Sequence, residues 1–260
     1  MKKNGTYWGD RMSPSKRKNE ILQTLHKHGK VKIDDLSQLL DVSSMTIRRD
    51  LDILEKEGEL IRIHGGAVLA KPLVQEVTFT QKESMELERK KDIAKKAVTF
   101  VKDGQTILLD SGTTTLEIAK LLKTRNNITV ITNDIHIASF LLDSELKVIV
   151  TGGELQNNVG TLYGPQTDIF LQNVYVDILF LGAPAVDIKA GVTTPTLEKA
   201  MLKQLMIKAA EATWLVADTT KLDTKAFAKV CDLKELTGFI TDDSISDEQT
   251  ILYTNYIKII

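Results

Sequence analysis

Several residue types that stabilise or functionalise proteins are scarce in this sequence. Its 260 residues include one cysteine, four histidines and five prolines, and 5% are aromatic. A single cysteine excludes an intrachain disulfide, which fits a reducing, cytoplasmic setting. No apolar run approaches the length of a membrane span, and the N-terminus lacks the apolar core of a secretory signal. We therefore expect no membrane segment. The histidines show no metal-ligand spacing, so we expect no metal, and we expect no cofactor.

The charged residues are almost balanced but unevenly distributed. The net charge is −1, from 34 basic and 35 acidic residues. Residues 1–68 hold 13 basic and 10 acidic residues, a net of +3, and residues 69–260 hold 21 and 25, a net of −4. The mildly basic charge of residues 1–68 weakly favours a nucleic-acid partner for this part of the chain. The length is enough for two domains or one large one, and apolar residues, 42% of the sequence, are as frequent as in ordinary globular proteins.

The first part of the chain shows helical periodicity followed by a hairpin pattern. Ile47, Leu51 and Leu54 recur at helical spacing behind Ser43, a good N-cap residue. The two glycines at 65–66 supply the positive φ that a tight turn between strands needs. The expected elements are a disordered extension over residues 1–14, helices over 15–28, 34–40 and 43–57, and strands over 59–63 and 67–69. This order is typical of a winged helix-turn-helix domain, here over residues 15–69.

The outer face of the third predicted helix carries groups that suit DNA. With the apolar stripe turned inward, short hydroxyls lie at the helix N-terminus and two adjacent arginines follow them. Hydroxyls and arginines bind phosphate oxygens, and an arginine fork also reads guanine. The alternative is a solvated helix end in which Arg48 pairs with Asp52 one turn away. The residues expected to contact double-stranded DNA are Ser43, Ser44, Met45, Thr46, Arg48, Arg49 and, in the hairpin, Arg62 and His64.

A dense set of residues between positions 16 and 68 matches a known pattern. The set consists of Arg17, Ile21, Val42, Ser43, Thr46, Ile47, Arg48, Arg49, Asp50, Leu51, Leu54, Gly58, Arg62, His64, Gly65, Gly66 and Ala67. On these residues the segment resembles the N-terminal domain of the DeoR family of bacterial regulators. The resemblance implies an operator-binding module, which in this family usually represses genes of carbohydrate uptake and catabolism.

Beyond residue 69 the pattern changes to alternating strands and helices. Residues 70–85 hold few periodic positions and are expected to form a linker. The expected strands cover residues 105–110, 128–132, 147–150, 176–181, 213–217 and 238–241, and the expected helices cover 87–102, 114–122, 135–142 and 197–212. This alternation is typical of an α/β domain with a mainly parallel sheet, here over residues 86–260.

The segment Asp110–Thr115, DSGTTT, has the composition of an anion-binding turn. It follows an apolar strand and opens a helix, where free backbone N–H groups and the helix dipole attract an anion. Its hydroxyls add donors, and Gly112 lets the backbone approach a ligand closely. The lysine of a nucleotide-binding P-loop is missing, which argues against ATP or GTP. The alternative is an ordinary capped helix after a strand.

Other small or polar loops follow neighbouring predicted strands. In open α/β sheets ligands bind at the carboxyl ends of the strands, so these loops are expected to share one site. Lys203 and Lys221 are expected to neutralise phosphate charge there, the alternative being two solvated surface lysines. The expected effector-binding residues are Asp110, Ser111, Gly112, Thr113, Thr114, Thr115, Thr132, Asn133, Gly152, Gly153, Lys203, Asp218 and Lys221.

A second set of residues extends the resemblance over most of the chain. The set includes Ile93, Ala94, Asp177, Phe180, Leu181, Gly182, Gly164, Gly191, Phe227 and Asp242 together with expected effector-binding residues from all the strand-end loops. On these residues, positions 86–242 resemble the DeoR-family effector domain. The resemblance implies a fold related to ribose-5-phosphate isomerase and glucosamine-6-phosphate deaminase. It also implies a phosphorylated sugar as effector and a homo-oligomer, dimer or tetramer.

One departure from the related enzymes bears on activity. The isomerases carry an Asp-Gly-Ala-Asp-Glu signature whose carboxylates do acid–base chemistry. Here the similar stretch, residues 181–185, reads Leu-Gly-Ala-Pro-Ala and is apolar at all three carboxylate positions. We therefore predict a non-enzymatic repressor of a sugar-utilisation operon, released by a phosphorylated sugar. The alternatives are a sugar-phosphate isomerase or deaminase fused to a DNA-binding module, and a constitutive DNA-binding structural protein.

Overall fold

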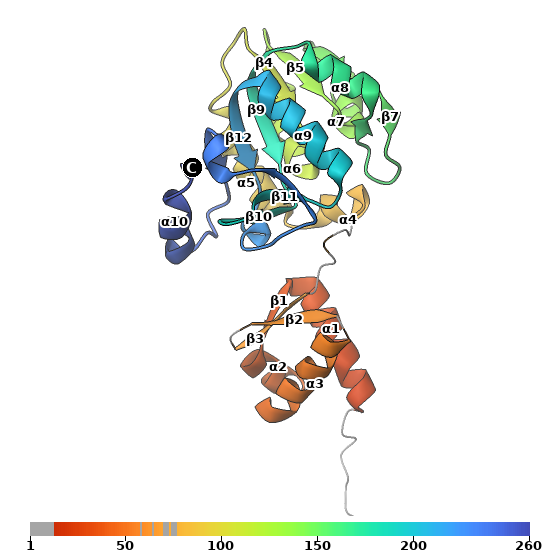
Figure 1. Cartoon of the computed structure of the whole chain (residues 1–260), viewed down its shortest axis with the longest axis vertical. Helices are drawn as coiled ribbons and strands as arrows, with labels where there is room; N and C mark the ends of the chain where they lie inside the picture. The colour runs from red at the N-terminus through yellow and green to blue at the C-terminus, as the bar shows by residue number, and fades with distance from the viewer. Residues whose placement is uncertain (1–12, 58, 64, 70–72, 74–76) are drawn as a thin grey trace, which may run out of the picture. The chain divides into compact units, whose positions relative to one another are not determined.

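The computed structural model describes residues 13–57, 59–63, 65–69, 73 and 77–260, in two compact units, Met1–Pro72 and Leu73–Ile260 (Figure 1). The described part of the first unit is a winged helix-turn-helix, and the second is built on a parallel sheet. The α/β fold class predicted from the sequence is therefore confirmed.

The first unit packs helices against a small antiparallel sheet. Its elements are α1 (Pro14–His28), β1 (Lys30–Lys32), α2 (Ile33–Leu39), α3 (Ser44–Lys56), β2 (Leu60–Ile63) and β3 (Gly66–Leu69). The sheet has the order β1-β3-β2, and β2 and β3 form the wing. Ile21, Leu25, Ile47 and Leu51 are completely buried in the core of this unit. The periodicity of α3 thus predicted its buried face.

Two local details of this unit differ from the sequence prediction. α1 begins at Pro14, within the predicted extension, because Ser13 Oγ accepts a hydrogen bond from the Lys16 N–H (3.3 Å). Proline suits the first turn, where its missing N–H would have no helical partner. Residues 31–33, expected to form a short extended piece, overlap β1, which begins and ends one residue earlier and pairs with β3. Gly66 permits the close approach of the two strands, since a Cβ there would lie 2.0 Å from the Val31 carbonyl oxygen.

The second unit is built on a six-stranded parallel sheet with the order β14-β12-β9-β4-β5-β6. The strands are β4 (Thr106–Leu109), β5 (Thr129–Thr132), β6 (Lys147–Val150), β9 (Val176–Gly182), β12 (Ala210–Val216) and β14 (Gly238–Ile240). The helices are α4 (Phe79–Ser84), α5 (Leu87–Val98), α6 (Thr113–Leu122), α7 (Ile135–Phe140), α8 (Pro165–Gln172), α9 (Leu197–Ala209) and α10 (Asp247–Thr254).

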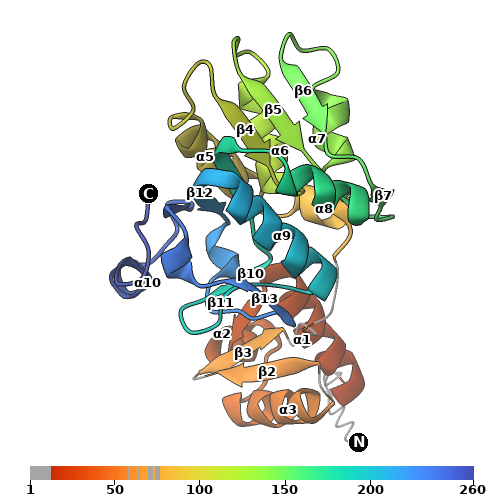
Figure 2. The same cartoon turned by 45° about the horizontal axis from the view of Figure 1, so that its top comes forward.

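Helices cover both faces of this sheet. Leu108 and Leu179 point into a core shared with α8 and α9, which lie together on one face in Figures 1 and 2. Ile107 and Ile178, the neighbours of those leucines in sequence, point into a second core shared with α5, α6 and α7. Burial on both faces explains why these strands read as continuous apolar runs in the sequence.

The strand order reverses between β4 and β9. From β4 the chain continues through α6, β5, α7 and β6 on one side of the sheet, and β9, β12 and β14 lie on the other side of β4. In open α/β sheets ligands bind outside the carboxyl ends of the strands at such a reversal. The loops after β4 and β9 therefore have the position expected of a binding site.

Several short elements were not predicted from the sequence. They are α4, which lies inside the segment expected to be a linker, the helices α8 and α10, the small sheet of β10 (Ala185–Asp187), β11 (Gly191–Thr194) and β13 (Ala228–Cys231), and the pair β7 (Glu154–Leu155) and β8 (Leu162–Tyr163). Elements this short contain too few repeats of a helical or strand period to be recognised. α9 ends at Ala209, before its predicted end, because Ala210 already pairs with Val176 in the sheet.

Candidate functional site

The N-terminus of α3 is capped by hydroxyl groups. Ser43 Oγ accepts a hydrogen bond from the Thr46 backbone N–H (3.2 Å) and lies 2.9 Å from Thr46 Oγ1. Among the residues predicted to contact DNA here, Ser43, Met45, Arg48 and Arg49 are exposed, and Ser44 and Thr46 are half-buried. The two arginines therefore lie on the solvent side of α3, where a DNA groove can reach them, and their contact with DNA stays a prediction.

A buried ion pair fixes α3 against α1. Arg17 Nε donates to Asp50 Oδ2 (2.5 Å) and Arg17 Nη2 donates to Asp50 Oδ1 (3.1 Å). The Asp50 carboxylate raises the pKa of Arg17, so the guanidinium stays charged. Both residues belong to the family pattern, but the sequence does not reveal that they pair, because they are 33 positions apart. The pair orients the face that carries the two exposed arginines.

The wing is fastened to the exposed side of α3. The Arg62 backbone N–H donates to Glu55 Oε1 (2.9 Å), and its Nη1 lies 3.4 Å from the Arg48 carbonyl oxygen and 3.4 Å from Asp52 Oδ1. Asp52 thus pairs with Arg62, so the suggested Arg48–Asp52 pair is wrong. His64, the other predicted wing contact, lies outside the described residues. Arg62 lies beside α3, which places any contact that it makes with DNA next to those of Arg48.

At the strand-order reversal, a second buried ion pair joins the ends of β4 and β9. Lys203 Nζ from α9 donates to Asp110 Oδ2 and to the Gly182 carbonyl oxygen (3.0 Å), and the Gly182 N–H donates to the same Asp110 oxygen (3.0 Å). The Lys203 side chain is 9% exposed and that of Asp110 is 3% exposed. Both predicted site residues therefore have partners inside the protein. Their role in holding the strand ends is clear, and their contact with an effector stays a prediction.

The loop after β4 is tied to the loop after β5. Ser111 Oγ donates to Asp134 Oδ2 (2.7 Å) and lies 2.7 Å from Thr161 Oγ1, and the Gly112 N–H donates to the same Asp134 oxygen (3.1 Å). Asp134 is buried, which raises its pKa, and its second oxygen caps α7 by accepting from the His136 N–H (2.7 Å). Asp134 and Thr161 were missed from the sequence. Asp134 stands where an N-cap precedes a helix, which is the signal that identifies it.

The remaining predicted residues of these two loops line the same region. Thr113 and Thr115 are buried, Thr114 is half-buried, and Thr115 Oγ1 donates to the Gly112 carbonyl oxygen (2.8 Å). Thr132 Oγ1 donates to the Leu109 carbonyl oxygen (2.9 Å), which links β5 to β4. Asn133 is completely buried, and its Oδ1 has no hydrogen-bond partner among the described residues. A buried acceptor without a donor is costly, and among the described residues of these two loops this oxygen is the one buried side-chain atom that the fold leaves unsatisfied.

A cluster of charges lies at the ends of β12 and β14. Lys221 Nζ pairs with Asp218 (3.2 Å), and Arg89 Nη1 donates to Thr219 Oγ1 (2.6 Å), whose N–H donates to Asp242 Oδ2 (2.7 Å). Lys90 is buried beside this cluster, and its burial, with a smaller effect of Lys221, lowers the pKa of Lys90 to about 8. Arg89 and Lys90 were not recognised as site residues from the sequence, where they look like solvated charges of a helix face.

Gly152 and Gly153, which follow β6, make a turn that needs glycine. Gly153 has φ +113°, and a Cβ there would lie 2.4 Å from both Thr167 Oγ1 and the Tyr163 carbonyl oxygen. Thr167 Oγ1 in turn donates to the Gly152 carbonyl oxygen (2.5 Å). Packing therefore accounts for Gly153, and the positive φ of +73° accounts for Gly152, where a Cβ would meet no atom within 4 Å. Contact of either glycine with an effector stays a prediction.

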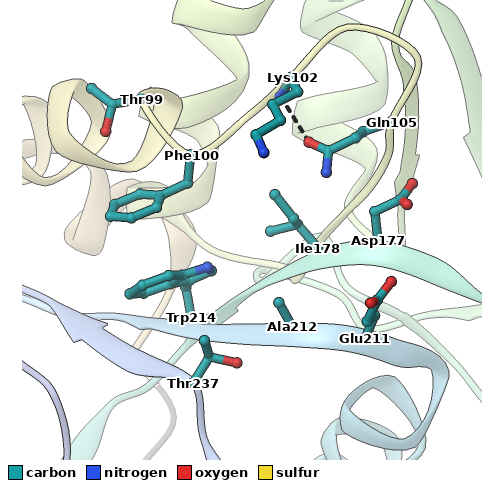
Figure 3. A pocket seen from close by; sticks show the side chains of 10 residues that line it. All are labelled: Thr99, Phe100, Lys102, Gln105, Asp177, Ile178, Glu211, Ala212, Trp214 and Thr237. Atoms are coloured by element: carbon teal, nitrogen blue, oxygen red, sulfur yellow. Dashed lines mark hydrogen bonds between the residues drawn. The ribbon is translucent and has the colours of Figure 1, made fainter.

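A cavity of about 470 Å³ opens at the opposite edge of the sheet, where the strands begin. Phe100 and Trp214 form one wall (Figure 3). Asp177 and Glu211 lie near each other on the opposite side of the cavity. Asp177 accepts a hydrogen bond from the Thr106 N–H (2.7 Å) and so anchors the start of β4. None of the predicted effector residues lines this cavity.

Within the described ranges, no group of three or more histidine, cysteine, aspartate or glutamate side chains is placed to hold a metal ion. Of the helices that the structure describes, none is long and apolar enough to span a bilayer.

Comparisons with known proteins agree with this two-part organisation. The DeoR-like helix-turn-helix domain matches residues 17–72, and the DeoR C terminal sensor domain matches residues 85–243. The chain is 38% identical to the HTH-type transcriptional regulator GlpR of Haloferax volcanii, over 90% of this chain and 92% of that one. It is 30% identical to the lactose phosphotransferase system repressor of Staphylococcus aureus, over 96% of this chain and 100% of that one.

A solved structure also overlaps part of the chain. Ribose 5-phosphate isomerase A from Methanocaldococcus jannaschii aligns with 51% of this chain and 53% of its own, at 21% identity and a TM-score of 0.39. A similarity this low supports no conclusion about function. The match to both family domains and the identity over nine-tenths of GlpR decide the assignment. The chain belongs to the DeoR family of helix-turn-helix transcriptional regulators.

Proposed function

We propose that this chain represses a sugar-related operon and leaves its operator when a phosphorylated sugar binds at the carboxyl edge of the parallel sheet. A related protein of Staphylococcus aureus is named as a repressor of the lactose phosphotransferase system, which supports repression of sugar-related genes. The observation that carries the effector class is the loop Ser111–Thr115, which begins the ten-residue helix α6 at the strand-order reversal.

The chemistry of this edge suits a phosphate attached to a polyol. The first N–H groups of α6 and the threonine hydroxyls offer neutral donors to an anion. Lys221 and Lys90 add positive charge, and Lys90 interacts electrostatically with Lys221, with Asp218 and with Glu117 of α6. Asn133 Oδ1 supports recognition of a sugar hydroxyl, which would donate to it.

No observation favours the isomerase alternative. Leu181 and Ala185, which stand at carboxylate positions of the isomerase signature, are buried apolar side chains. Asp187, the next acidic residue along the chain, accepts hydrogen bonds from the Lys189 and Ala190 N–H groups and so shapes a turn. The relatives are named transcriptional regulators.

Control of DNA binding follows from linkage between two ligands. A sugar that binds more tightly to an arrangement with low DNA affinity shifts the population toward that arrangement. We propose that the chain acts as a homo-oligomer, in which the spacing of the DNA-binding units sets which half-sites they reach together.

A gel-shift titration tests the proposal. The purified chain is titrated onto the DNA upstream of its own gene, with and without ribose 5-phosphate, fructose 6-phosphate, fructose 1-phosphate, glucosamine 6-phosphate, galactose 6-phosphate and inorganic phosphate. Calorimetry with the same panel measures binding directly. We expect one sugar phosphate to bind and to weaken the DNA complex, and inorganic phosphate alone to do so poorly. Turnover of a panel member by the purified chain would instead support an enzyme.

Replacing Arg48 or Arg49 with alanine is expected to weaken operator binding by about 1–3 kcal/mol if the side chain reads a base. A phosphate contact would weaken all DNA sequences alike and flatten the salt dependence. Gel shifts on operator and scrambled DNA at several salt concentrations distinguish the two. Arg125→Ala, in the second unit, is the matched control. Unchanged operator affinity in both variants would exclude this face of α3 as the DNA contact.

Replacing Lys221 with alanine is expected to weaken sugar-phosphate binding by about 1.5–3 kcal/mol, the value of a hydrogen bond to a charged group. Gly112→Ala is expected to weaken it as well, by blocking close approach of the phosphate. A Cβ at Gly112 meets only Thr115 Oγ1, at 3.5 Å, so this variant should fold normally. Both variants should bind operator and ignore the sugar. Normal induction in both would place the site elsewhere.

A further inference from the structure

The short helix α4 is the first helix of the second unit, and it is attached to that unit at both ends. It follows the residues that lead from the DNA-binding unit, and Thr78 and Gln81 form a capping box at its start. Nothing in the proposed functions of the two units uses these attachments. Their partners, however, interact with residues next to the loops proposed to bind the effector: His136 with Asp134, and Lys90 with Lys221.

At its start, α4 is attached through an aromatic stack. The Phe79 ring lies on the His136 ring of α7, with centroids 3.6 Å apart and an interplanar angle of 16°, and the Phe79 N–H donates to the Asn158 carbonyl oxygen (2.8 Å). Gly160 backs the imidazole, since a Cβ there would lie 2.4 Å from the His136 ring. His136 therefore has little freedom to move without moving Phe79.

The stack leads directly to the loop proposed to bind phosphate. The backbone N–H of His136 donates to Asp134 Oδ1 (2.7 Å). The other Asp134 oxygen accepts from Ser111 Oγ and from the Gly112 backbone N–H. A phosphate bound at this loop competes for those two donors and repels the Asp134 carboxylate. Binding there thus disturbs the residue that positions His136.

At its end, α4 is attached through a buried lysine. Lys90 Nζ donates to the Lys82 carbonyl oxygen and to the Met85 carbonyl oxygen (2.5 Å), which satisfies acceptors that a helix end leaves open. Lys90 is 4% exposed, and the charges of Lys221 and Asp218 are close enough to act on its ammonium group. A phosphate is a stronger acceptor for an ammonium group than two neutral carbonyls. An anion near Lys221 therefore draws Lys90 away from α4.

The corner between α4 and α5 is held in an unusual conformation. Glu86 has φ +53°, which residues other than glycine, asparagine and aspartate rarely adopt. Arg89 holds it through an ion pair with Glu86 (2.9 Å), and donates to Thr219 after β12. The corner thus depends on contacts with a loop of the same carboxyl edge.

We propose that α4 is a latch that is docked while the carboxyl edge is empty and is released when a sugar phosphate binds there. The inference rests on the proposed function and adds how the sugar is sensed by the DNA-binding unit. Docking fixes α4, the first helix of the second unit, on α7 and Lys90, and release frees it. Because both attachments end at residues beside the effector site, sugar binding and latch docking oppose each other.

The test uses the full chain with Phe79→Ala, which removes the stack, and His136→Ala, which removes the other ring and leaves the α4 sequence intact. Phe100→Ala, which breaks the Phe100–Trp214 pair (centroids 4.1 Å apart) at the opposite edge, is the matched control. Operator affinity is measured by gel shift without sugar, the affinity for each panel sugar phosphate by calorimetry, and opening of α4 by hydrogen exchange of its amides.

In both latch variants the α4 amides are expected to exchange hydrogen faster. Both variants are expected to bind operator at least about fivefold more weakly without sugar. They should bind the sugar phosphate more tightly by a similar factor, because coupling between two ligands is reciprocal. Phe100→Ala should change none of these. If both latch variants bound operator and sugar phosphate with wild-type affinities, the latch would be overturned and the proposed function would stand. Weaker operator binding with unchanged sugar binding would also overturn it. If no panel sugar binds to the wild-type chain, the proposed effector fails, and the latch fails with it.

Discussion

Replacing Lys203 with methionine is expected to lower the free energy of unfolding of the second unit by about 3–5 kcal/mol, the cost of leaving one partner of a buried ion pair without the other. The variant keeps the Asp110 carboxylate, 3% exposed, and removes the ammonium group that neutralises it. It also removes the donor to the Gly182 carbonyl oxygen at the end of β9. Urea unfolding followed by circular dichroism measures the change.

Two further variants separate the buried charge from the loss of packing. Lys229→Met removes one partner of an exposed pair with Asp232 (2.7 Å) and should leave the unfolding midpoint unchanged. The double variant Asp110→Leu with Lys203→Met should recover part of the lost stability, because no uncompensated charge remains buried. If Lys203→Met left the unfolding midpoint unchanged, as Lys229→Met should, the buried ion pair would contribute nothing to the stability of the second unit. If the double variant were as unstable as Lys203→Met alone, the lost stability would come from packing and not from the buried charge.

The parts of this fold that the sequence revealed are those with a repeating pattern. The seam of Ile47, Leu51 and Leu54 predicted which side of α3 is buried, and hence which side exposes Arg48 and Arg49. The apolar runs of the central strands predicted a parallel sheet because such strands are buried on both faces. A pattern that repeats within one element is local information, and sequence reasoning can use it.

The partners that complete the sites were harder to predict because they are distant in sequence. Lys203 is 93 positions from Asp110, and Thr161 is 50 positions from Ser111. Lys203 was expected to face a phosphate, yet its ammonium group is engaged by Asp110, since only the folded sheet shows that α9 passes the end of β4. The latch contact between Phe79 and His136 is invisible for the same reason. Residue type indicates the chemistry available, and topology decides which groups meet.

Replacing Asp50 with alanine is expected to lower the free energy of unfolding of the DNA-binding unit by about 3 kcal/mol, the low end for a broken buried ion pair. The low end applies because the Arg17 side chain keeps 11% of its surface exposed and water can partly solvate it. A small unit is marginally stable, so a loss of this size populates its unfolded state. Operator binding should therefore fail on warming before sugar-phosphate binding by the second unit does.

Gel shifts and calorimetry across a temperature series measure the two activities of the Asp50→Ala chain separately. Lys18→Ala, which removes a more exposed pair between α1 and Glu57 (2.9 Å), is the control and should bind operator as the wild type does. The double variant Arg17→Met with Asp50→Leu should regain operator binding, because α3 is again packed without a lone buried charge. If Asp50→Ala kept wild-type operator binding at all temperatures, the pair would not orient α3. If the double variant folded but still failed to bind, the charges themselves would act in DNA recognition, since the face that carries Arg48 and Arg49 would be intact.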